Sequence, residues 1–514
     1  MAEGAFFREN LMLKKTLMLW NDRIGLPLIL LAGFILRVYN LSAHSFFSDE
    51  VFVVNAVKAH ASALFVCDAP HGPLYLYVMF FWTKLFGSNE FWTRFPSVLF
   101  GVATIYLVYV LTLELFGKKP ALTAAFLTSF SPFLILYNRT GRWYSLFVML
   151  GVMSVYFTAK YIRTNKSFDL FLGFLSALFL LYCEAMGVFI IAVQWAAVLP
   201  AFKKIGIKWI LSQIALFVLI IPAAVVFVTR MYLITPANMA DRGVGGGLMF
   251  RAGYAFFSFS LGQTVSPFYL PVIIPFLIFF MAVFAAGVIS FYKVNRTAGI
   301  FLGIYLSLLS LKIFLNISAP HYLMDACIPY FIILSLGLSS IRDKRLFAFA
   351  LMLVLFIFSY SLYNLYSDRQ YNRMELVDEW KQISSYVENI SDKGTLVLHS
   401  ESSRFCSDSP IYYYAIKKPQ YQKISEDAKN QKKNITEHMK KDKKNKTILV
   451  SRPLSGLFRK EMEQNAGLKK WLDKKYVLIS VKGFSRDREA YLKRRYVNRS
   501  FPEYRIIVYE YGSR

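Results

Sequence analysis

The sequence predicts a polytopic α-helical membrane protein that ends in a soluble α/β domain. Three observations support this class. Of 514 residues, 56% are hydrophobic and only 18% are charged, whereas soluble proteins average about 25% charged residues. Long apolar runs recur over residues 1–366, and short basic clusters separate them. After residue 366, short β-rich runs alternate with helical patterns.

Eleven apolar runs have the length of transmembrane helices, which need roughly 17–25 residues. They cover residues 24–41, 95–116, 120–137, 143–162, 168–183, 185–202, 208–230, 266–292, 297–316, 321–341 and 346–366. No small-residue cleavage site follows a short apolar core, so we expect the first run to stay as an anchor. The predicted membrane domain is therefore residues 1–366, with about 11 transmembrane helices.

The basic residues predict the orientation of these spans. Cytoplasmic loops of membrane proteins are enriched in lysine and arginine. With a cytoplasmic N-terminus, every predicted inner segment is basic: these segments carry Arg8, Lys14, Lys15, Arg23, Lys118, Lys119, Lys160, Arg163, Lys166, Lys203, Lys204, Lys208, Lys293, Arg296, Arg342, Lys344 and Arg345. An odd number of spans puts residues 367–514 outside, in a bacterial inner (plasma) membrane protein. Topology and the basic tail thus explain the net charge of +27 without nucleic acid.

Two long outer loops are predicted, over residues 42–94 and 231–265. Residues 71–86 within the first are apolar enough for a short span, but counting them would put every later lysine cluster outside. We therefore interpret them as a helix in the membrane interface. The second loop contains Gly243, Gly245, Gly246 and Gly247, which fits a mobile lid or a disordered connector.

The tail, residues 367–514, is predicted to be an extracytoplasmic α/β domain. Its β-rich runs are 395–399, 411–416, 447–451, 476–481 and 505–511, and its helical runs are 375–389, 426–441 and 457–472. Nine lysines lie between Lys423 and Lys446. They fit a solvated face or linker, or a surface for anionic lipid or polysaccharide.

The acidic pair Asp49-Glu50 follows the outer end of the first span, ahead of a predicted amphipathic helix at 51–66. Loop solvation would explain two acidic residues in an outer loop. A carboxylate fixed beside Arg37 and the other residues that end the first span can instead accept a proton from an incoming hydroxyl, as a general base does.

Several further polar residues fall at the outer ends of spans. Arg94, Arg139 and Arg142 run against the positive-inside trend; they fit snorkelling anchors or, because guanidinium forks match phosphate oxygens, a phosphate site. Lys58 and Lys84 fit interfacial anchors. Glu184 and His321 also lie at the outer ends of spans. A histidine there is usually a satisfied polar residue, but beside a phosphate it can donate or bind metal.

In their order and spacing these segments resemble the glycosyltransferase-C superfamily, in the branch of the protein O-mannosyltransferases and lipid A aminoarabinose transferases. The resembling segments are RVYNL at 37–41, HGPLYLY at 71–77, LFGSNEFWTRFPSVLFG at 85–101, SPFLILYNRTGRWYSL at 131–146, LYCEAMGVFIIAVQ at 181–194, HYLMDACIPYFIILSLGL at 321–338, DEWKQISSYV at 378–387 and IYYYAI at 411–416. The likeness is good over the membrane half and loose over the tail.

The resemblance implies roles for particular positions. Asp49 matches the base of the family's acidic pair, with Glu50 beside it, and Arg94 matches an arginine that meets the lipid phosphate. His71-Gly72-Pro73-Leu74 matches a His-Pro-Pro-Leu element, with glycine for the first proline. Gly141-Arg142-Trp143-Tyr144 matches an Ala-Arg-x-Tyr element.

Three positions depart from the family's pattern. Thr140 stands where an acidic residue often lies, Glu184 where many relatives carry histidine, and His321 where many carry arginine. The resemblance thus implies a donor-phosphate site of Arg94, Arg142, Arg139 and His321, and a substrate pocket of His71, Tyr144, Glu184 and Arg37. A divalent metal is left open.

The implied enzyme is an inverting glycosyltransferase that moves a sugar from a polyprenyl-phosphate monosaccharide to an acceptor hydroxyl outside the membrane. The acceptor can be a glycan, a lipid or a protein. Three alternatives stay open: a polytopic transporter or flippase, a ligase for preassembled glycans, and a non-catalytic envelope-assembly protein. A transporter would carry its sites near the midplane of two repeated halves, which the sequence does not display.

Overall fold

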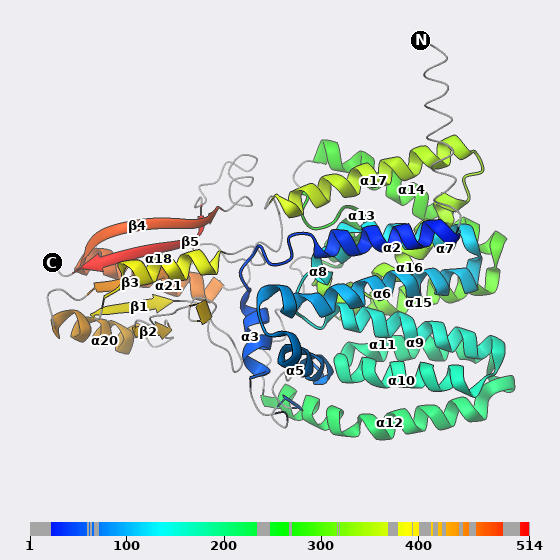
Figure 1. Cartoon of the computed structure of the whole chain (residues 1–514), viewed down its shortest axis with the longest axis horizontal. Helices are drawn as coiled ribbons and strands as arrows, with labels where there is room; N and C mark the ends of the chain where they lie inside the picture. The colour runs from blue at the N-terminus through cyan, green and yellow to red at the C-terminus, as the bar shows by residue number, and fades with distance from the viewer. Residues whose placement is uncertain are drawn as a thin grey trace, which may run out of the picture. The chain divides into compact units, whose positions relative to one another are not determined.

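The computed structural model divides into two compact units (Figure 1). Unit 1 is Met1–Leu41 with Ala59–Ser367, and unit 2 is Ser42–Lys58 with Asp368–Arg514. The structure describes residues 22–58, 61, 64–65, 71–233, 247–266, 270–315, 317, 319–367, 379–392, 394–399, 413–414, 420–423, 428–441, 446–451, 459–486 and 504–512.

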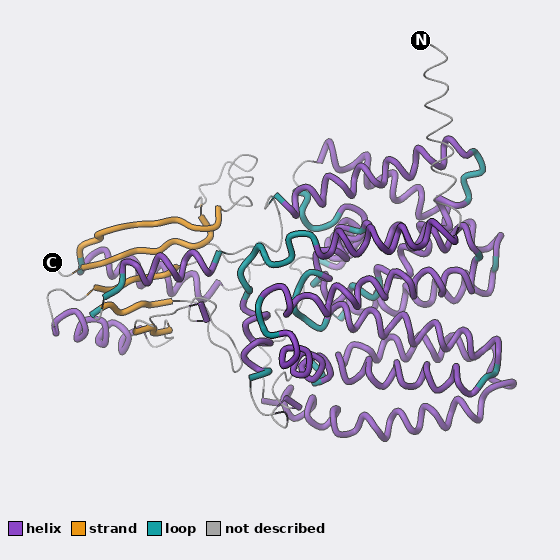
Figure 2. Tube along the Cα trace, in the orientation of Figure 1, coloured by secondary structure: helices purple, strands orange, loops and turns teal. Residues whose placement is uncertain are grey.

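Unit 1 is helical, with short connections between long helices (Figure 2). Its α-helices are α2 (Asp22–Val38), α5 (Leu74–Phe86), α6 (Glu90–Phe116), α7 (Lys118–Phe130), α8 (Pro132–Asn138), α9 (Tyr144–Thr164), α10 (Ser167–Cys183), α11 (Val188–Val198), α12 (Phe202–Leu233), α13 (Leu248–Leu261), α14 (Leu270–Val294), α15 (Arg296–Phe314), α16 (Cys327–Ser339) and α17 (Lys344–Tyr366). Three 3₁₀ turns join them: η1 (Ala185–Gly187), η2 (Leu199–Ala201) and η5 (Pro320–Leu323).

Each predicted span coincides with a helix or with consecutive helical segments. Among the described residues, six helices are long and apolar enough to cross a membrane, or seven if the bent pair α7–α8 is one span. Four shorter apolar helical segments are α5, α10, Ala185–Ala201 and α16. The chain is accordingly a multi-pass helical membrane protein.

The span predicted over 120–137 is broken. Helices α7 and α8 are bent by 57° at Ser131. Pro132 opens α8, where its missing N–H removes no helical hydrogen bond, whereas α7 cannot continue through it. The Ser131 hydroxyl caps α8 by accepting from the Leu134 N–H at 3.2 Å. The break leaves the last carbonyls of α7 without partners in their own helix.

The predicted second outer loop contains a helix, α13, that the sequence analysis did not identify. Its residues are almost all apolar or aromatic, and most residues of its C-terminal half are buried. Gly243, Gly245 and Gly246, on which the lid hypothesis rested, lie outside the described residues. Helix α5 falls within residues 71–86, where an interfacial helix was predicted.

Helices α14 and α16 cross at two glycines. A Cβ atom at Gly337 would lie 2.0 Å from the Val283 carbonyl oxygen, and one at Gly287 would lie 2.1 Å from the Ile333 carbonyl oxygen. Only residues without a side chain allow the two backbones this approach, a common solution in membrane helix packing.

Unit 2 contains a five-stranded mixed sheet in the order β2-β1-β3-β5-β4. Strands β2, β1 and β3 are parallel neighbours, and β5 runs antiparallel to β3 and β4. The strands are β1 (Thr395–His399), β2 (Gln420–Lys423), β3 (Lys446–Ser451), β4 (Val477–Arg486) and β5 (Tyr504–Gly512). The predicted run at 411–416 is wrong where it is described, because Tyr413 and Tyr414 are helical; β2 was not predicted.

Three helices cover the two faces of this sheet. Successive strand residues point to opposite faces. Val397 and Ile448 therefore pack with Trp380 of α18, whereas Leu398 and Leu449 pack with α20 and α21. The helices are α18 (Trp380–Ile390), α20 (Ala428–Lys441) and α21 (Arg459–Lys475).

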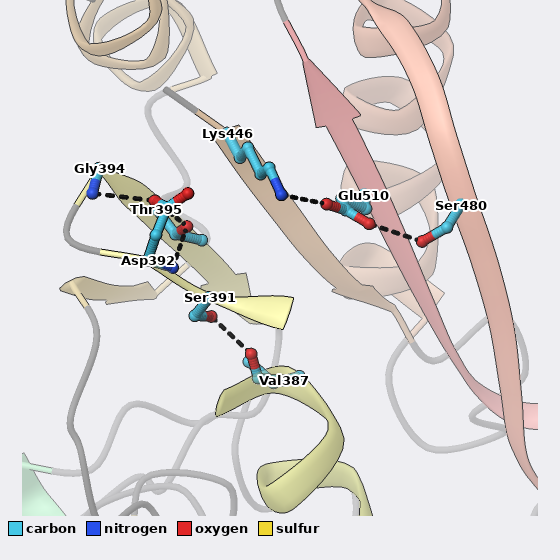
Figure 3. Close-up of polar contacts among 8 residues, drawn as sticks. All are labelled: Val387, Ser391, Asp392, Gly394, Thr395, Lys446, Ser480 and Glu510. Carbon is cyan, nitrogen blue, oxygen red and sulfur yellow. Dashed lines mark hydrogen bonds and ion pairs between the residues drawn. The ribbon is translucent and has the colours of Figure 1, made fainter. Parts of the chain in front are cut away.

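Polar contacts join three of the strands (Figure 3). The Lys446 Nζ atom of β3 lies 3.0 Å from a carboxylate oxygen of Glu510 in β5, and the Ser480 hydroxyl of β4 donates to the other oxygen at 2.8 Å. At the start of β1, the Asp392 carboxylate accepts from the Thr395 hydroxyl (2.8 Å) and the Gly394 N–H (3.0 Å). An ion pair between strands and a hydrogen-bonded turn thus stabilise the sheet in addition to its hydrophobic packing.

Helix α3 (Ser48–Ala56) packs in unit 2. The Phe46 N–H donates to the Tyr414 hydroxyl at 2.7 Å, and the Phe46 ring lies 5.7 Å from that of Tyr413. The Ser45 hydroxyl accepts from the Lys381 N–H at 3.1 Å. These contacts give the helical Tyr413 and Tyr414 a tertiary reason to leave the strand that tyrosines favour.

Candidate active site

Arg37 joins the end of α2 to the break between α7 and α8. Its Nε donates to Asn138 Oδ1 at 2.8 Å, and its terminal nitrogens donate to the carbonyls of Ser129 (2.9 Å) and Thr128 (3.2 Å). The guanidinium thereby satisfies the last carbonyls of α7. The side chain is fully buried, and its place in the substrate pocket stays a prediction.

Arg139 caps the C-terminal end of α2. Its guanidinium donates to the carbonyls of Arg37 (2.9 Å) and Asn40 (3.1 Å), and to that of Tyr39. It also lies 5.1 Å from the centre of the Tyr366 ring. Asn40 has a left-handed φ of 54°, which ends α2 and turns these carbonyls outward. Arg139 therefore has a structural task in addition to any role with a ligand.

The first turns of α6 carry Arg94 and contact the backbone of Arg142. Arg94 is 4% exposed and donates to the Leu41 carbonyl at 2.9 Å. Ser97 lies three residues later, on the same face of α6, and its hydroxyl donates to the Arg142 carbonyl at 3.3 Å. Two largely buried arginine residues are thus connected to the first turns of α6.

His71 contacts Glu184 directly, through its Nδ1 atom and a carboxylate oxygen. Glu184 is 1% exposed and also caps η1 by accepting from the Met186 N–H at 3.4 Å. The Gly72 N–H donates to the Cys183 carbonyl at 3.1 Å. The segment that opens α5 is therefore attached to the end of α10, and the carboxylate fixes the orientation of the imidazole.

An aromatic cluster surrounds this pair; it consists of His71, Trp143, Tyr144, His321 and Tyr322. The His71 ring lies 4.9 Å from Trp143, and Trp143 lies 6.1 Å from Tyr322. The His321 ring lies 4.2 Å from Tyr322 and 5.3 Å from Tyr144. Trp143 and Tyr144 are buried, whereas the other three rings are partly exposed.

The turn between α8 and α9, residues 139–143, connects these groups. It carries Arg139 and Arg142, and Trp143 leads into the aromatic cluster. Asn138, just before it, holds Arg37 and also donates to the Ser145 hydroxyl at 2.8 Å. Of the predicted unit 1 residues, the structure joins His71, Glu184, Tyr144 and His321 in one set of contacts, with the arginines around this turn.

The acidic pair belongs to unit 2, in the first turn of α3. Helix α3 begins at Ser48, so Asp49 and Glu50 lie inside the helix rather than ahead of it as predicted. Glu50 is fully buried, and its carboxylate accepts from the Phe47 N–H at 3.4 Å, as a capping residue does. Asp49 is exposed. Its convergence with Arg94 stays a prediction.

Some site residues were not identified from the sequence. Lys312 and Asp325 form a buried ion pair beside the aromatic cluster, with 2.6 Å between Nζ and Oδ2. Each is a lone charge near the end of an apolar run, which is a signal that could have been used. Trp143 and Tyr322 gave no comparable signal, since aromatic residues make up 17% of the chain.

Metal binding was left open by the sequence. Within the described ranges, no three histidine, cysteine, aspartate or glutamate residues are grouped in a way that could hold a metal ion.

One family model matches part of the chain. Residues 70–230 match the family model described as dolichyl-phosphate-mannose-protein mannosyltransferase. This segment contains His71, Arg94, the α8–α9 turn and Glu184. No curated protein sequence matches the chain.

Two solved structures of ArnT from Cupriavidus metallidurans have a similar fold. The apo structure aligns with a TM-score of 0.57 at 11% identity and covers 94% of this chain and 97% of ArnT. The structure bound to undecaprenyl phosphate aligns with a TM-score of 0.54 at 12% identity, with the same coverage. The family match and the shared fold confirm the resemblance inferred from the sequence.

Proposed function

We propose that this chain, a membrane glycosyltransferase by its family match and fold, transfers a sugar from a polyprenyl-phosphate monosaccharide to an acceptor hydroxyl. The observation that carries the proposal is the gathering of guanidinium, imidazole and aromatic groups around the α8–α9 turn. The turn itself lies in the segment that matches the mannosyltransferase family model. ArnT, which has a similar fold, was solved with undecaprenyl phosphate.

The donor phosphate is assigned to Arg94 and Arg142, with Arg139 and His321 as further contacts. When the bond between C1 of the sugar and the phosphate oxygen breaks, the phosphate leaves with the bonding electrons. It then carries more negative charge, which preorganised guanidinium groups stabilise. Because both arginines are largely buried, this stabilisation is stronger than it would be in water.

The general base is assigned to Asp49. The acceptor oxygen forms the new bond to C1 from the face opposite the leaving phosphate, which inverts the anomeric centre, and its proton passes to the Asp49 carboxylate. Asp49 suits this role better than Glu50, because Glu50 is buried as the cap of α3.

The sugar ring is assigned to the aromatic cluster, with His71 held by Glu184 for hydrogen bonding to a sugar hydroxyl. Partly exposed rings beside buried ones supply apolar faces for a sugar's C–H groups. The polar tips of His71, His321 and Tyr322 supply hydrogen-bonding groups. The acceptor class, whether glycan, lipid or protein, and any divalent metal are open within this proposal.

The topology is proposed as eleven crossings with the N-terminus in the cytoplasm and unit 2 outside, in the plasma membrane. The support is the coincidence of the eleven predicted spans with helical segments and the basic composition of every predicted inner segment. This orientation puts the α8–α9 turn and the start of α6 on the outer side.

The test measures label transfer from radiolabelled polyprenyl-phosphate sugars to envelope extracts by the purified chain. Asp49→Asn should reduce transfer by at least about a hundredfold, in line with the loss of general-base catalysis. Glu114→Gln, which removes a carboxylate that pairs with exposed Arg163, is the matched control and should transfer normally. Full activity of Asp49→Asn would remove the base assignment, and a wild-type protein that labels no acceptor would refute the function.

A further inference from the structure

A buried ion pair that the proposed reaction does not use lies between α15 and α16. The Lys312 Nζ atom is 2.6 Å from Asp325 Oδ2 and donates to the Tyr322 carbonyl at 3.1 Å. The other carboxylate oxygen of Asp325 accepts from the Ala326 N–H at 3.0 Å. The two side chains are 0% and 2% exposed, so the charges are fully removed from water.

Stability alone does not explain this pair. Moving two charges out of water costs several kcal/mol per ion, and apolar replacements of similar volume are often neutral or stabilising. The surroundings would accept such replacements, since the rings of Phe147 and Phe189 lie 5.6 Å and 5.5 Å from the Lys312 Nζ atom. Paired charges inside a membrane domain more often serve function.

The pair fixes the backbone beneath two rings of the aromatic cluster. Lys312 donates to the Tyr322 carbonyl and to the Asp325 carboxylate, so α15 is attached to this segment at two points. Asp325 is itself oriented by the N–H of Ala326. The Tyr322 ring lies 6.1 Å from that of Trp143, and the ring of His321, the residue directly before Tyr322, lies 5.3 Å from that of Tyr144. Through Lys312, helix α15 thus fixes the backbone that carries the His321 and Tyr322 rings.

We propose that Lys312 and Asp325 are positioning residues that hold His321 and Tyr322 in place for the sugar phosphate donor. The effect on catalysis rests on the proposed function, whereas the effect on the placement of His321 does not. Neither residue contacts the substrate. Their action is mechanical: the ion pair keeps the segment from moving by the ångström or so that would misalign a bound donor, a displacement that can cost about a hundredfold in rate.

The test uses a variant that removes both charges together, Lys312→Met/Asp325→Leu. Either single change would leave a buried unpaired charge and harm folding, whereas the double change leaves none. The matched control is Arg163→Met/Glu114→Leu, which removes a partly exposed pair of the same unit. Lys312→Arg, which keeps the positive charge, should retain most of the wild-type behaviour.

The first measurement is independent of activity. Diethyl pyrocarbonate modifies exposed imidazoles, and peptide mass spectrometry reports its rate at each histidine. We expect modification of His321 to rise severalfold in Lys312→Met/Asp325→Leu, with His438 in unit 2 unchanged, and no rise in the control variant. An unchanged rate at His321 would overturn the inference, even if the wild-type enzyme transfers sugar.

The second measurement is a double-mutant cycle on sugar transfer. Lys312→Met/Asp325→Leu should lower kcat/KM by about a hundredfold. In a His321→Ala/Tyr322→Ala background, the same change should cost little more, because the positioned groups are already absent. Wild-type activity of the charge-free variant, or full additivity in the cycle, would overturn the inference. A wild-type protein without transfer would refute the proposed function, while the modification rates would still decide the placement.

Discussion

Position 72 requires a residue that has a backbone N–H to donate and that has no side chain. The N–H donates to Cys183, and a Cβ atom would lie 1.9 Å from the Tyr182 carbonyl oxygen. A proline could meet neither condition. This explains the glycine where the resembling family has the first proline of its His-Pro-Pro-Leu element. His71 is fixed to Glu184 in the same place, so local backbone chemistry and the candidate site depend on each other.

Gly72→Ala should therefore destabilise the protein by about 1–3 kcal/mol, the usual cost of forcing extra atoms into packed space. Thermal unfolding in detergent would measure the change. Gly303→Ala is the matched control, because a Cβ atom at Gly303 has nothing within 4 Å. A Gly72→Ala protein as stable as the control would show that α5 and α10 can separate without cost.

Single residues also set the limit of prediction for the site. Arg94 and His71 were predicted as site residues because an arginine or histidine at the end of an apolar run is unusual and resembles the family's pattern. The tasks of Arg37 and Arg139 were not foreseen. Both depend on carbonyls exposed by the break at Ser131 and by the left-handed Asn40, and sequence alone does not reveal where carbonyls lack partners.

At the scale of elements, the membrane helices were predicted well because lipid leaves the backbone few choices. An apolar run of bilayer length must satisfy its N–H and C=O groups internally, and a helix does so. The misses fall where other forces act: α13 in a presumed loop, β2 with its polar Gln420–Lys423 residues, and the helical Tyr413-Tyr414. In the last case, contacts from Phe46 outweigh local preference.

The crossing of α14 and α16 should be sensitive to any added side chain. Gly337→Val would force the helices apart, since even a Cβ atom would meet the Val283 carbonyl at 2.0 Å. We expect lower yields of folded protein and a melting temperature several degrees lower, in the range of about 2–8 °C per kcal/mol for ordinary domains. Gly253→Val, at an open position, is the control. Equal melting temperatures would contradict the close packing.

At the scale of the whole molecule, the two units differ in how they are packed and in what they expose. Unit 1 exposes apolar side chains along α12, such as Phe217 at 62% and Val225 at 58%, as expected for a surface facing lipid. Unit 2 instead packs helices against both faces of a sheet. The stability of unit 2 should depend on pH through Asp473, a carboxylate at the end of α21.

Asp473 should make unit 2 sensitive to acid. Although partial burial acts to raise it, hydrogen bonds from Lys469 (2.6 Å) and Tyr511 (2.8 Å) keep the pKa of Asp473 below its usual value. A depressed folded-state pKa adds stability above the unfolded value of about 3.9, and this stability is lost as the pH falls through the folded value. The effect is modest, because Asp473 is partly exposed.

Hydrogen exchange followed by mass spectrometry, corrected for the intrinsic rate at each pH, would measure this loss in the full chain. Protection of residues 459–475 should fall as the pH is lowered below about 4. In Asp473→Asn, protection should be lower at neutral pH and depend less on acid. The same acid dependence in the variant and the wild type would assign the effect to another carboxylate.

The membership of α3 in unit 2 has a consequence for recombination between relatives. A chimera that exchanges only the C-terminal tail would separate Phe46 and Ser45 from Tyr414 and Lys381, their partners across more than three hundred residues of chain. The segment that contains Asp49 would then pack against residues of the other parent protein. Crossover points that keep each unit intact fall at 41/42, 58/59 and 367/368. Residues 42–58 and 368–514 should therefore be exchanged together.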